Sequence, residues 1–284
     1  MPPLIYLVRH AEAEHNVSRD PNARDARLTQ RGKAQCARLL ETFPAHDSID
    51  LVVASPLRRT IQTAVLSLAP SLARENVEFL LLPEAQEVSD MTCNVGFLRE
   101  ELEVEVQKLF GDDESAALAA CRKINYTAVV DGWNSKKGIW DSEKSAVRAR
   151  AAKLRAWLYA RPEKIIAVVS HGNFLHYLTE AWVEPMYFEG KTATAKVTAL
   201  GLTPPKGMIF PFLSVPSLPL ELEYLYQPIA IKFPYTISNC CLRIGTSWAN
   251  CETHQFEFSP NSNEHEAHLT ETAESKNARK HFGP

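Results

Sequence analysis

The chain has 284 residues, of which 45% are hydrophobic and 23% charged, and its formal net charge is −3 at pH 7. These values allow a sizeable folded core, and they exclude a protein whose bulk charge attracts nucleic acid or an anionic membrane. No apolar run is long enough to span a bilayer and no leader signal opens the sequence, so we expect a cytoplasmic protein, with the nucleus as the alternative. The six cysteines lack metal-site spacing, which indicates reduced thiols and no metal.

The first predicted strand, residues 4–8, is a short apolar run that ends at Arg9 and His10. Such runs are typical of buried strands, and in open α/β sheets the chemistry gathers at the carboxyl ends of the strands. Arginine offers an oxyanion a fork of donors, and a histidine beside it can act as a nucleophile or a proton carrier. The pair therefore suggests an oxyanion site, although the same dipeptide also occurs on ordinary protein surfaces.

Two further strand ends carry the same residue types. Residues 52–54 run into a predicted helix, with Ser55 as the N-cap and Pro56 at the first helical position. Arg59 then lies near the helix start, where backbone N–H groups also favour an anion. Residues 165–169 form another apolar strand, which ends at Ser170 and His171. Three strand ends therefore carry two arginines and two histidines.

The segments between these strands have helical patterns. Predicted helices cover residues 29–40, 97–110, 114–122, 142–159 and 174–182, and residues 77–82 form one more strand. In the helix over 142–159, Val147, Ala151, Leu154 and Leu158 make a core-facing stripe. Strands that alternate with helices predict a three-layer α/β/α sandwich with a mostly parallel central sheet.

Three motifs in this order carry a resemblance to a known family. They are Leu7-Val8-Arg9-His10-Ala11-Glu12, Ser55-Pro56-Leu57-Arg58-Arg59-Thr60 and Val168-Val169-Ser170-His171-Gly172-Asn173. Together they resemble the histidine phosphatase superfamily, whose fold is phosphoglycerate-mutase-like. The resemblance covers roughly residues 3–190 and the stretch after Gly245. One departure is Ala11, where the family usually has glycine; alanine costs little there if its φ is negative.

The resemblance implies a phosphoric monoester hydrolase that needs no metal and no cofactor. His10 would attack phosphorus and form a phosphohistidine, which requires that its other ring nitrogen donate to a carbonyl or carboxylate. Arg9, Arg59, His171 and Asn16 would hold the phosphoryl oxygens, because phosphoryl transfer depends on positioning and charge stabilisation. His171 is thus expected both in the catalytic set and among the phosphate ligands.

The proton donor for the leaving group is expected after the strand at 77–82. A carboxylic acid near the pocket is the usual donor. By resemblance Glu87 is the acid, while Glu84 and Asp90 are alternatives because the flanking pattern is loose. All three could also be solvated loop carboxylates.

Residues 90–122 and 131–141 lie where the superfamily varies, so they are expected to set substrate choice. Lys136 and Lys137 could meet a second anionic group on a substrate, but a solvated lysine pair is the favoured interpretation. The substrate is expected to be a phosphorylated small molecule or a phosphoprotein. No nucleic-acid or membrane partner is expected, and the oligomeric state is not visible from the sequence.

Residues 191–243 do not fit the pattern, because they are rich in proline and apolar residues without helical or alternating periodicity. They could be a lid or partner-binding loop, or a translated intron. Gly190-Lys191 can be encoded with a GTAAG donor, Ser238-Asn239 with a CTAAC branch site, and Arg243 with an acceptor AG. Transcript reads across codons 190–244 decide between these hypotheses.

The family-like domain is expected to span residues 1–258 around that insertion. Its closing edge strand would lie within residues 248–258, and the polar stretch 259–284 is expected to be a disordered tail. A phosphoglycerate-mutase-type phosphotransferase is the alternative function within the superfamily. A catalytically inactive phosphate-binding or interaction protein is the alternative of another class.

Overall fold

The computed structural model describes residues 1–18, 23–111, 114–181 and 248–280. These residues belong to one compact unit, although the chain between its last two segments is long. The insertion at 191–243 lies outside the described residues, so the intron hypothesis stays a prediction. Within the described ranges, no helix combines the length and the apolar character that a membrane crossing requires.

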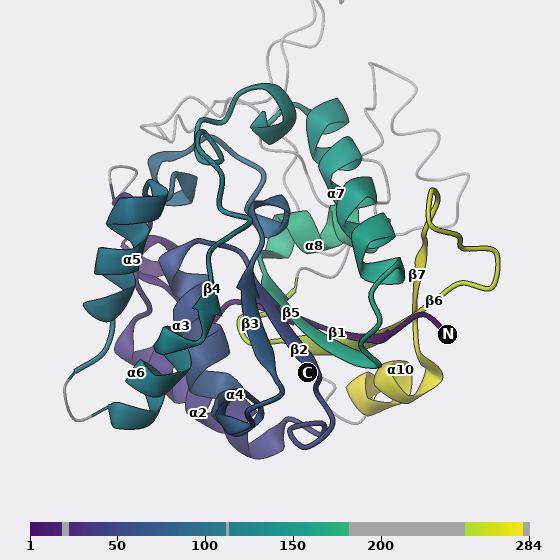
Figure 1. Cartoon of the computed structure of the whole chain (residues 1–284), viewed down its shortest axis with the longest axis horizontal. Helices are drawn as coiled ribbons and strands as arrows, with labels where there is room; N and C mark the ends of the chain where they lie inside the picture. Colours follow the sequence, from purple (N-terminus) through teal and green to yellow (C-terminus); the bar gives the residue numbers. More distant parts are fainter. Residues whose placement is uncertain (19–22, 112–113, 182–247, 281–284) are drawn as a thin grey trace, which may run out of the picture. The chain divides into compact units, whose positions relative to one another are not determined.

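A seven-stranded sheet with the order β4-β3-β2-β5-β1-β6-β7 organises this unit (Figure 1). Five strands pair in parallel: β1 (Leu4–Arg9), β2 (Leu51–Ala54), β3 (Glu78–Leu81), β4 (Ile124–Asn125) and β5 (Ile165–Ser170). Two antiparallel strands, β6 (Thr253–Phe258) and β7 (Leu269–Glu271), complete the edge beside β1. The mostly parallel sheet predicted from the sequence is confirmed. The strand expected within residues 248–258 is β6, but it is not the edge strand, because β7 pairs outside it.

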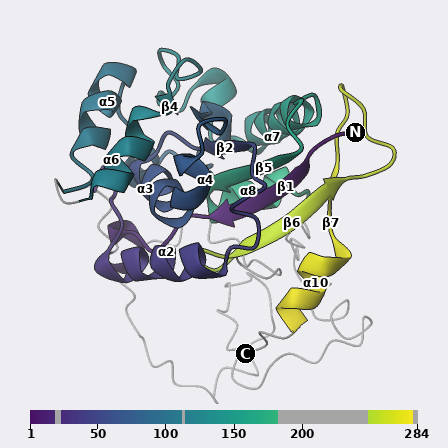
Figure 2. The ribbon, with the colours of Figure 1, turned by 60° about the horizontal axis from the view of Figure 1, so that its bottom comes forward.

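Helices cover both faces of the sheet (Figure 2). One face carries α2 (Gln30–Thr42), α3 (Arg58–Ser67), α4 (Ala69–Ala73), α5 (Arg99–Gln107) and α6 (Ser115–Arg122). The other face carries α7 (Lys144–Tyr159) and α8 (Gly172–Leu178). The short α1 (Glu14–Val17) follows β1, and α10 (Ala273–Lys280) follows β7. Three 3₁₀ turns, Pro83–Ala85, Thr92–Asn94 and Gly138–Trp140, lie in the connections.

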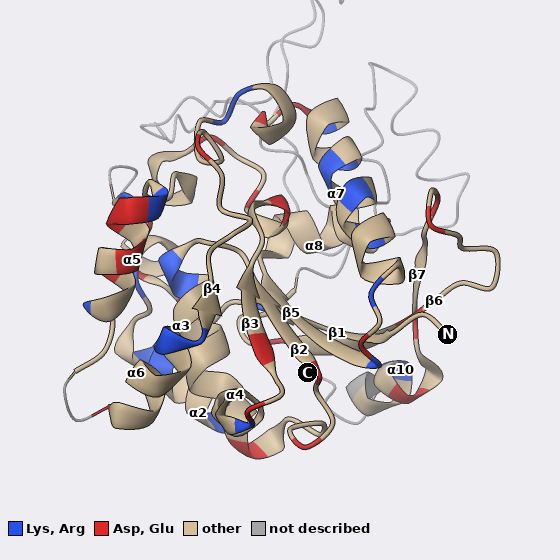
Figure 3. Ribbon diagram, in the orientation of Figure 1, with Lys and Arg blue, Asp and Glu red and all other residues tan. Residues whose placement is uncertain are grey.

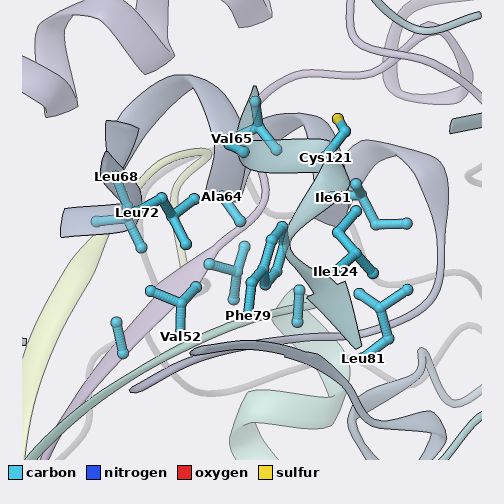
Figure 4. Close-up of a cluster of buried hydrophobic side chains, with 14 of the residues drawn as sticks. Val52, Ile61, Ala64, Val65, Leu68, Leu72, Phe79, Leu81, Cys121 and Ile124 are labelled. Atoms are coloured by element: carbon cyan, nitrogen blue, oxygen red, sulfur yellow. The ribbon is translucent and has the colours of Figure 1, made fainter. Parts of the chain in front are cut away.

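Alternating strand residues supply two separate cores. Val52, Phe79 and Leu81 point to the α3 side, where they meet Ile61 and Leu72 (Figure 4). Their strand neighbours, such as Val53 and Leu80, join the stripe of α7 on the opposite face. The central strands β1, β2 and β5 are thus buried on both faces, which explains why they read as continuous apolar runs.

The ends of two predicted helices differ from the structure. Thr29 caps α2 as expected, with its Oγ1 accepting the N–H of Gly32 at 3.0 Å. Ser55, in contrast, is not the cap of α3, because the helix begins at Arg58 after an extended Leu57. The last predicted helix ends at Leu178 rather than at residue 182. Local cap patterns locate a helix only to within a few residues, since tertiary contacts compete for the same side chains.

The expectation that residues 259–284 form a disordered tail is wrong for the described part, up to residue 280. β7 pairs with β6 in the register Phe256↔Glu271 and Phe258↔Leu269, and α10 follows it. Ala267 and Leu269 are buried in the core on the α7 side. The expectation rested on the average composition of the segment, which does not reveal two buried apolar residues. Strand pairing also satisfies the backbone hydrogen-bonding groups whatever the side chains are, so a polar segment can join the sheet.

Candidate active site

The carboxyl edge of the sheet brings the predicted residues together. β1 and β5 pair with Arg9 opposite Ser170, so His10 and His171 leave neighbouring strands at the same level. Their ring centroids lie 5.2 Å apart. Arg59 reaches this edge from the first turn of α3. The prediction that these strand ends converge is therefore confirmed by the geometry.

His10 is held in one tautomer by its own backbone. Only 2% of the residue is exposed, and Nδ1 lies 2.7 Å from the carbonyl oxygen of Ala11. A carbonyl can only accept, so the proton resides on Nδ1 and Nε2 keeps its lone pair. Burial, followed by the charges of Arg59 and Arg9, holds the pKa of His10 well below its usual value. The ring is neutral and presents a nucleophilic nitrogen.

Arg59 is fully buried, and hydrogen bonds to the loop that contains Cys93 and Asn94 fix its side chain. Its Nη1 donates to the Cys93 carbonyl at 2.9 Å, and its Nη2 donates to Oδ1 of Asn94 at 2.8 Å. Its Nε is buried and has no hydrogen-bond acceptor within the described part of the chain. Nη1 and Nη2 thus fix the guanidinium, and its Nε–H remains available to donate to a ligand.

Arg9 is positioned by segments far apart in the sequence. Its Nη1 donates to the carbonyl of Trp248, and a Cβ on Gly172 would lie 3.2 Å from its Nε. Gly172 therefore gives Arg9 the space to lie across the start of α8. The segment that contains Trp248 also supports His10, because Nδ2 of Asn250 donates to the His10 carbonyl at 3.0 Å.

His171 is fully buried beside the side chain of Ser55. Its Nε2 lies 2.9 Å from Oγ of Ser55, while Nδ1 finds no hydrogen-bond partner among the residues described. Burial, then the charges of Arg59, His10 and Lys136, keep the pKa of His171 well below its usual value. Ser55 thus orients the second histidine instead of capping α3.

Asp25 is a buried carboxyl that the sequence analysis did not identify. Its Oδ1 accepts the backbone N–H of Arg58 at 2.9 Å and lies 4.0 Å from Nη1 of Arg59. Burial raises its pKa to about 6, although both arginines act in the opposite direction. It supplies negative charge behind the two arginines at the start of α3.

Among the three candidate acids, Glu87 is the one whose charge acts on the buried guanidinium of Arg59. Burial lowers the pKa values of Arg59, Lys136 and Arg150, and the charge of Glu87 opposes that fall in all three. Glu84 instead forms an ion pair with Lys153 at 2.8 Å, and Asp90 is exposed. The geometry therefore favours Glu87 over the two alternatives.

Lys136 is not part of a solvated pair, so that interpretation is wrong. Its Nζ donates to Oε1 of Gln86 at 2.6 Å and to the carbonyl of Glu87 at 3.1 Å. Burial and the nearby Arg150 lower its pKa to about 7. Lys137 is exposed, as expected for a surface lysine. Loop sequences carry little information about such contacts, which bridge 50 residues of chain.

Asn16, expected to touch phosphate, makes its recorded hydrogen bonds within the α1 region. Its Oδ1 accepts the N–H of Ala13 at 3.0 Å, and its Nδ2 lies 3.1 Å from Nε2 of His15. His15 itself lies close to the site, with its ring centroid 5.7 Å from that of His10. The sequence analysis missed His15, and its place directly before Asn16 was the available signal.

The arrangement is suited to binding an oxyanion around a neutral histidine. Buried N–H donors without acceptors are rare in proteins, and Nε of Arg59 is one of them among the described residues. Acidic residues gather on α5 (Figure 3), where Glu105 pairs with Arg58 at 2.7 Å. No cluster of three or more His, Cys, Asp or Glu side chains in the described segments is placed to hold a metal ion.

Comparisons with known proteins agree with this geometry. The sequence model of the histidine phosphatase superfamily (branch 1) matches residues 5–92, which contain Arg9, His10, Arg59 and Glu87. A probable phosphatase of Schizosaccharomyces pombe is 27% identical over 173 residues, covering 59% of this chain and 73% of that protein. Phosphoglycerate mutase-like protein 1 of Arabidopsis thaliana is 28% identical over 212 residues, covering 62% of this chain and 71% of its own length.

A third relative shares a shorter segment at higher identity. Phosphoserine phosphatase 1 of Hydrogenobacter thermophilus is 44% identical over 62 residues, which cover 22% of this chain and 29% of that protein. Family match, relatives and strand-end geometry point in the same direction. Residues 5–92 match the histidine phosphatase superfamily, and the chain is similar to proteins named as phosphatases and as phosphoglycerate mutase-like proteins.

Proposed function

We propose that the protein hydrolyses phosphoric monoesters through a phosphohistidine on His10. The tautomer of His10 is the observation that carries this proposal. Because Nδ1 donates to the Ala11 carbonyl, Nε2 is left as an unprotonated nucleophile beside Arg59 and Arg9. An inactive phosphate-binding protein would have no need of a histidine held in this state.

The reaction divides into two displacements at phosphorus. In the first, Nε2 of His10 forms a bond to phosphorus while the ester oxygen leaves and takes a proton from Glu87. Arg9, Arg59 and His171 stabilise the charge on the equatorial oxygens, which is the largest contribution that a protein makes to phosphoryl transfer. In the second, water attacks the phosphohistidine, Glu87 receives its proton, and inorganic phosphate leaves.

Hydrolysis of an aryl phosphate in the presence of a chelator tests this function. The parent chain should turn over, and His10→Ala should lose nearly all activity, because no other group forms the covalent intermediate. His265→Ala, which changes an exposed histidine on the 259–268 loop, is the matched control and should behave as the parent. Activity that survives in His10→Ala would contradict the proposed role of His10.

The covalent intermediate can be examined directly. Brief incubation of the parent with a ³²P-labelled phosphomonoester, followed by denaturation, should leave label on the protein that is acid-labile and alkali-stable. The same label should be absent from His10→Ala. A parent that hydrolyses the ester without ever carrying label would favour direct attack by water.

A phosphotransferase of the mutase type remains a second candidate, favoured by one observation. A mutase must retain a bisphosphorylated intermediate, which needs cationic groups beyond the phosphoryl site. Lys136 and Arg150 lie near Glu87 and could meet such a second anion. Phosphoglycerate isomers, followed by ³¹P NMR, distinguish the two activities: release of inorganic phosphate supports hydrolysis, whereas interconversion without release supports a mutase.

For the substrate, we propose a phosphorylated small molecule first and a phosphoprotein second. Glu100, Glu101 and Glu103 place negative charge on α5, as Figure 3 shows, and would disfavour highly charged ligands that approach over this helix. Comparison of phosphoserine with a phosphoserine peptide measures the preference. A higher kcat/KM for the peptide would reverse the proposed order.

A further inference from the structure

His15 lies beside the candidate active site but has no role in the reaction described above. It belongs to α1, a single turn in which no residue is buried, so core packing does not explain it. Its ring centroid is 5.7 Å from that of His10, and the centroid of His171 is 5.2 Å from that of His10. Burial and the charges of Arg59 and Arg9 lower its pKa to about 3. At neutral pH the ring is therefore uncharged and carries one proton.

The hydrogen bonds of Asn16 determine where that proton resides. The backbone N–H of Ala13 can only donate, so the atom of Asn16 that it meets at 3.0 Å must be the amide oxygen. The amide nitrogen of Asn16 then faces Nε2 of His15 at 3.1 Å. Since an amide nitrogen can only donate, Nε2 must accept, and the proton of the neutral ring is on Nδ1.

This Nδ1–H group has nothing to donate to. Nδ1 of His15 is buried, and it has no hydrogen-bond partner in the part of the chain that the structure describes. A buried donor without an acceptor is unfavourable and rare, so it requires a structural or functional reason. Nε of Arg59, which always carries a proton, is likewise buried without an acceptor in the described residues. A ligand with several acceptor oxygens would satisfy both donors.

We propose that His15 is a phosphate ligand, whose Nδ1–H donates to an oxygen of the phosphoryl group that is transferred to His10. Asn16 then acts as a positioning residue, because it selects the tautomer that can donate. The assignment rests on the proposed function, since it names a further contact of the same phosphoryl site. It also changes the expected role of Asn16, from a direct phosphate contact to support of His15.

Calorimetric titration of the full chain with inorganic phosphate tests the assignment. His15→Phe keeps a ring but removes the donor, and we expect the Kd for phosphate to rise roughly 10-fold or more, as for loss of a hydrogen bond to a charged group. His15→Asn places an amide nitrogen near the position of Nδ1 and should recover much of the affinity. His265→Phe, at an exposed histidine, should leave the Kd unchanged.

The outcomes separate this assignment from the proposed function. A parent chain that binds phosphate, together with a His15→Phe variant whose Kd lies within twofold of the parent, would overturn the assignment alone. A parent chain that neither binds phosphate nor hydrolyses an aryl phosphate would overturn the proposed function and the assignment with it.

A second measurement needs no variant and reports on the ring directly. The ¹⁵N shifts of His15 should show Nδ1 protonated and Nε2 unprotonated in the parent chain, and added phosphate should protect the Nδ1 proton from exchange with water. Signals from an Nε2–H tautomer, or an Nδ1 proton unaffected by saturating phosphate, would refute the assignment even if His15→Phe failed to fold.

Discussion

Asp25 should make the stability of this protein fall as the pH rises between about 4 and 6. The carboxyl is fully buried, and burial raises its pKa from 3.8 to about 6, even though Arg59 and Arg58 act in the opposite direction. The folded protein therefore holds this proton more tightly than the unfolded chain does. The stability contributed in this way is fully present below pH 3.8 and is lost as the pH rises through 6.

The size of the effect follows from the two pKa values. Each pKa unit corresponds to about 1.4 kcal/mol, so the contribution of Asp25 should fall by about 3 kcal/mol in total, from well below the unfolded pKa to well above the folded one. Asp25→Asn removes the titration and retains an oxygen for the N–H of Arg58, which Oδ1 accepts at 2.9 Å. Any pH-independent cost of the substitution cancels when the difference between variant and parent is compared at two pH values.

Urea unfolding of both proteins, measured from pH 4 to pH 7.5, tests this reasoning. The free energy of unfolding of Asp25→Asn minus that of the parent should increase by roughly 2.5 kcal/mol from the acidic to the neutral end, because part of the effect is already lost at pH 4. Asp47→Asn, at an exposed position, is the control and should give a difference that does not vary with pH. A flat difference for Asp25→Asn would refute the argument that burial controls its protonation.

Two further predictions concern the loops that follow β3 and β4. Glu87→Gln should lower kcat for alkyl phosphates roughly 10²–10⁴-fold, and much less for a nitrophenyl phosphate whose leaving group needs no proton; Glu84→Gln is the control, and equal losses in both variants would be evidence against Glu87 as the acid. Burial lowers the pKa of Lys136 in the folded protein to about 7, so the parent is destabilised by the charged lysine below that pH. The free energy of unfolding of Lys136→Met minus that of the parent should therefore be largest below pH 7 and should decrease towards pH 10.5. Urea unfolding at pH 6.5 and pH 10 measures this, and an advantage that grew with pH would contradict it.

The residues that converge at the sheet edge could be predicted because two local signals agree. Arg9, His10 and His171 each follow a short apolar run, and parallel pairing brings such strand ends to one edge. Arg59 follows a third strand in the same way. The proposed acid, Glu87, could not be separated from Glu84 and Asp90 by sequence, because the three carboxylates share a short loop and only the tertiary structure shows that Glu84 pairs with Lys153.

Other parts of the site gave no signal in the sequence. Asn94 and Cys93 hold Arg59 across about 35 residues of chain, and Trp248 holds Arg9 across 239. Neither pairing has a periodicity or a motif, because each contact depends on how loops return to the sheet. The intron hypothesis for residues 191–243 also stays a prediction, and transcript reads across codons 190–244 decide it.

By itself, the sequence determined the α/β class and the mostly parallel sheet, and it placed the proposed nucleophile, His10, at a strand end, because alternating apolar strands and helices are local patterns. The tertiary structure alone decided the protonation states of His10, His15 and Asp25. These states depend on burial and on the charges of Arg59 and its neighbours, which are properties of distance in the folded chain. It also decided that residues 269–280 join the fold, since pairing with β6 stabilises a segment whose composition is polar.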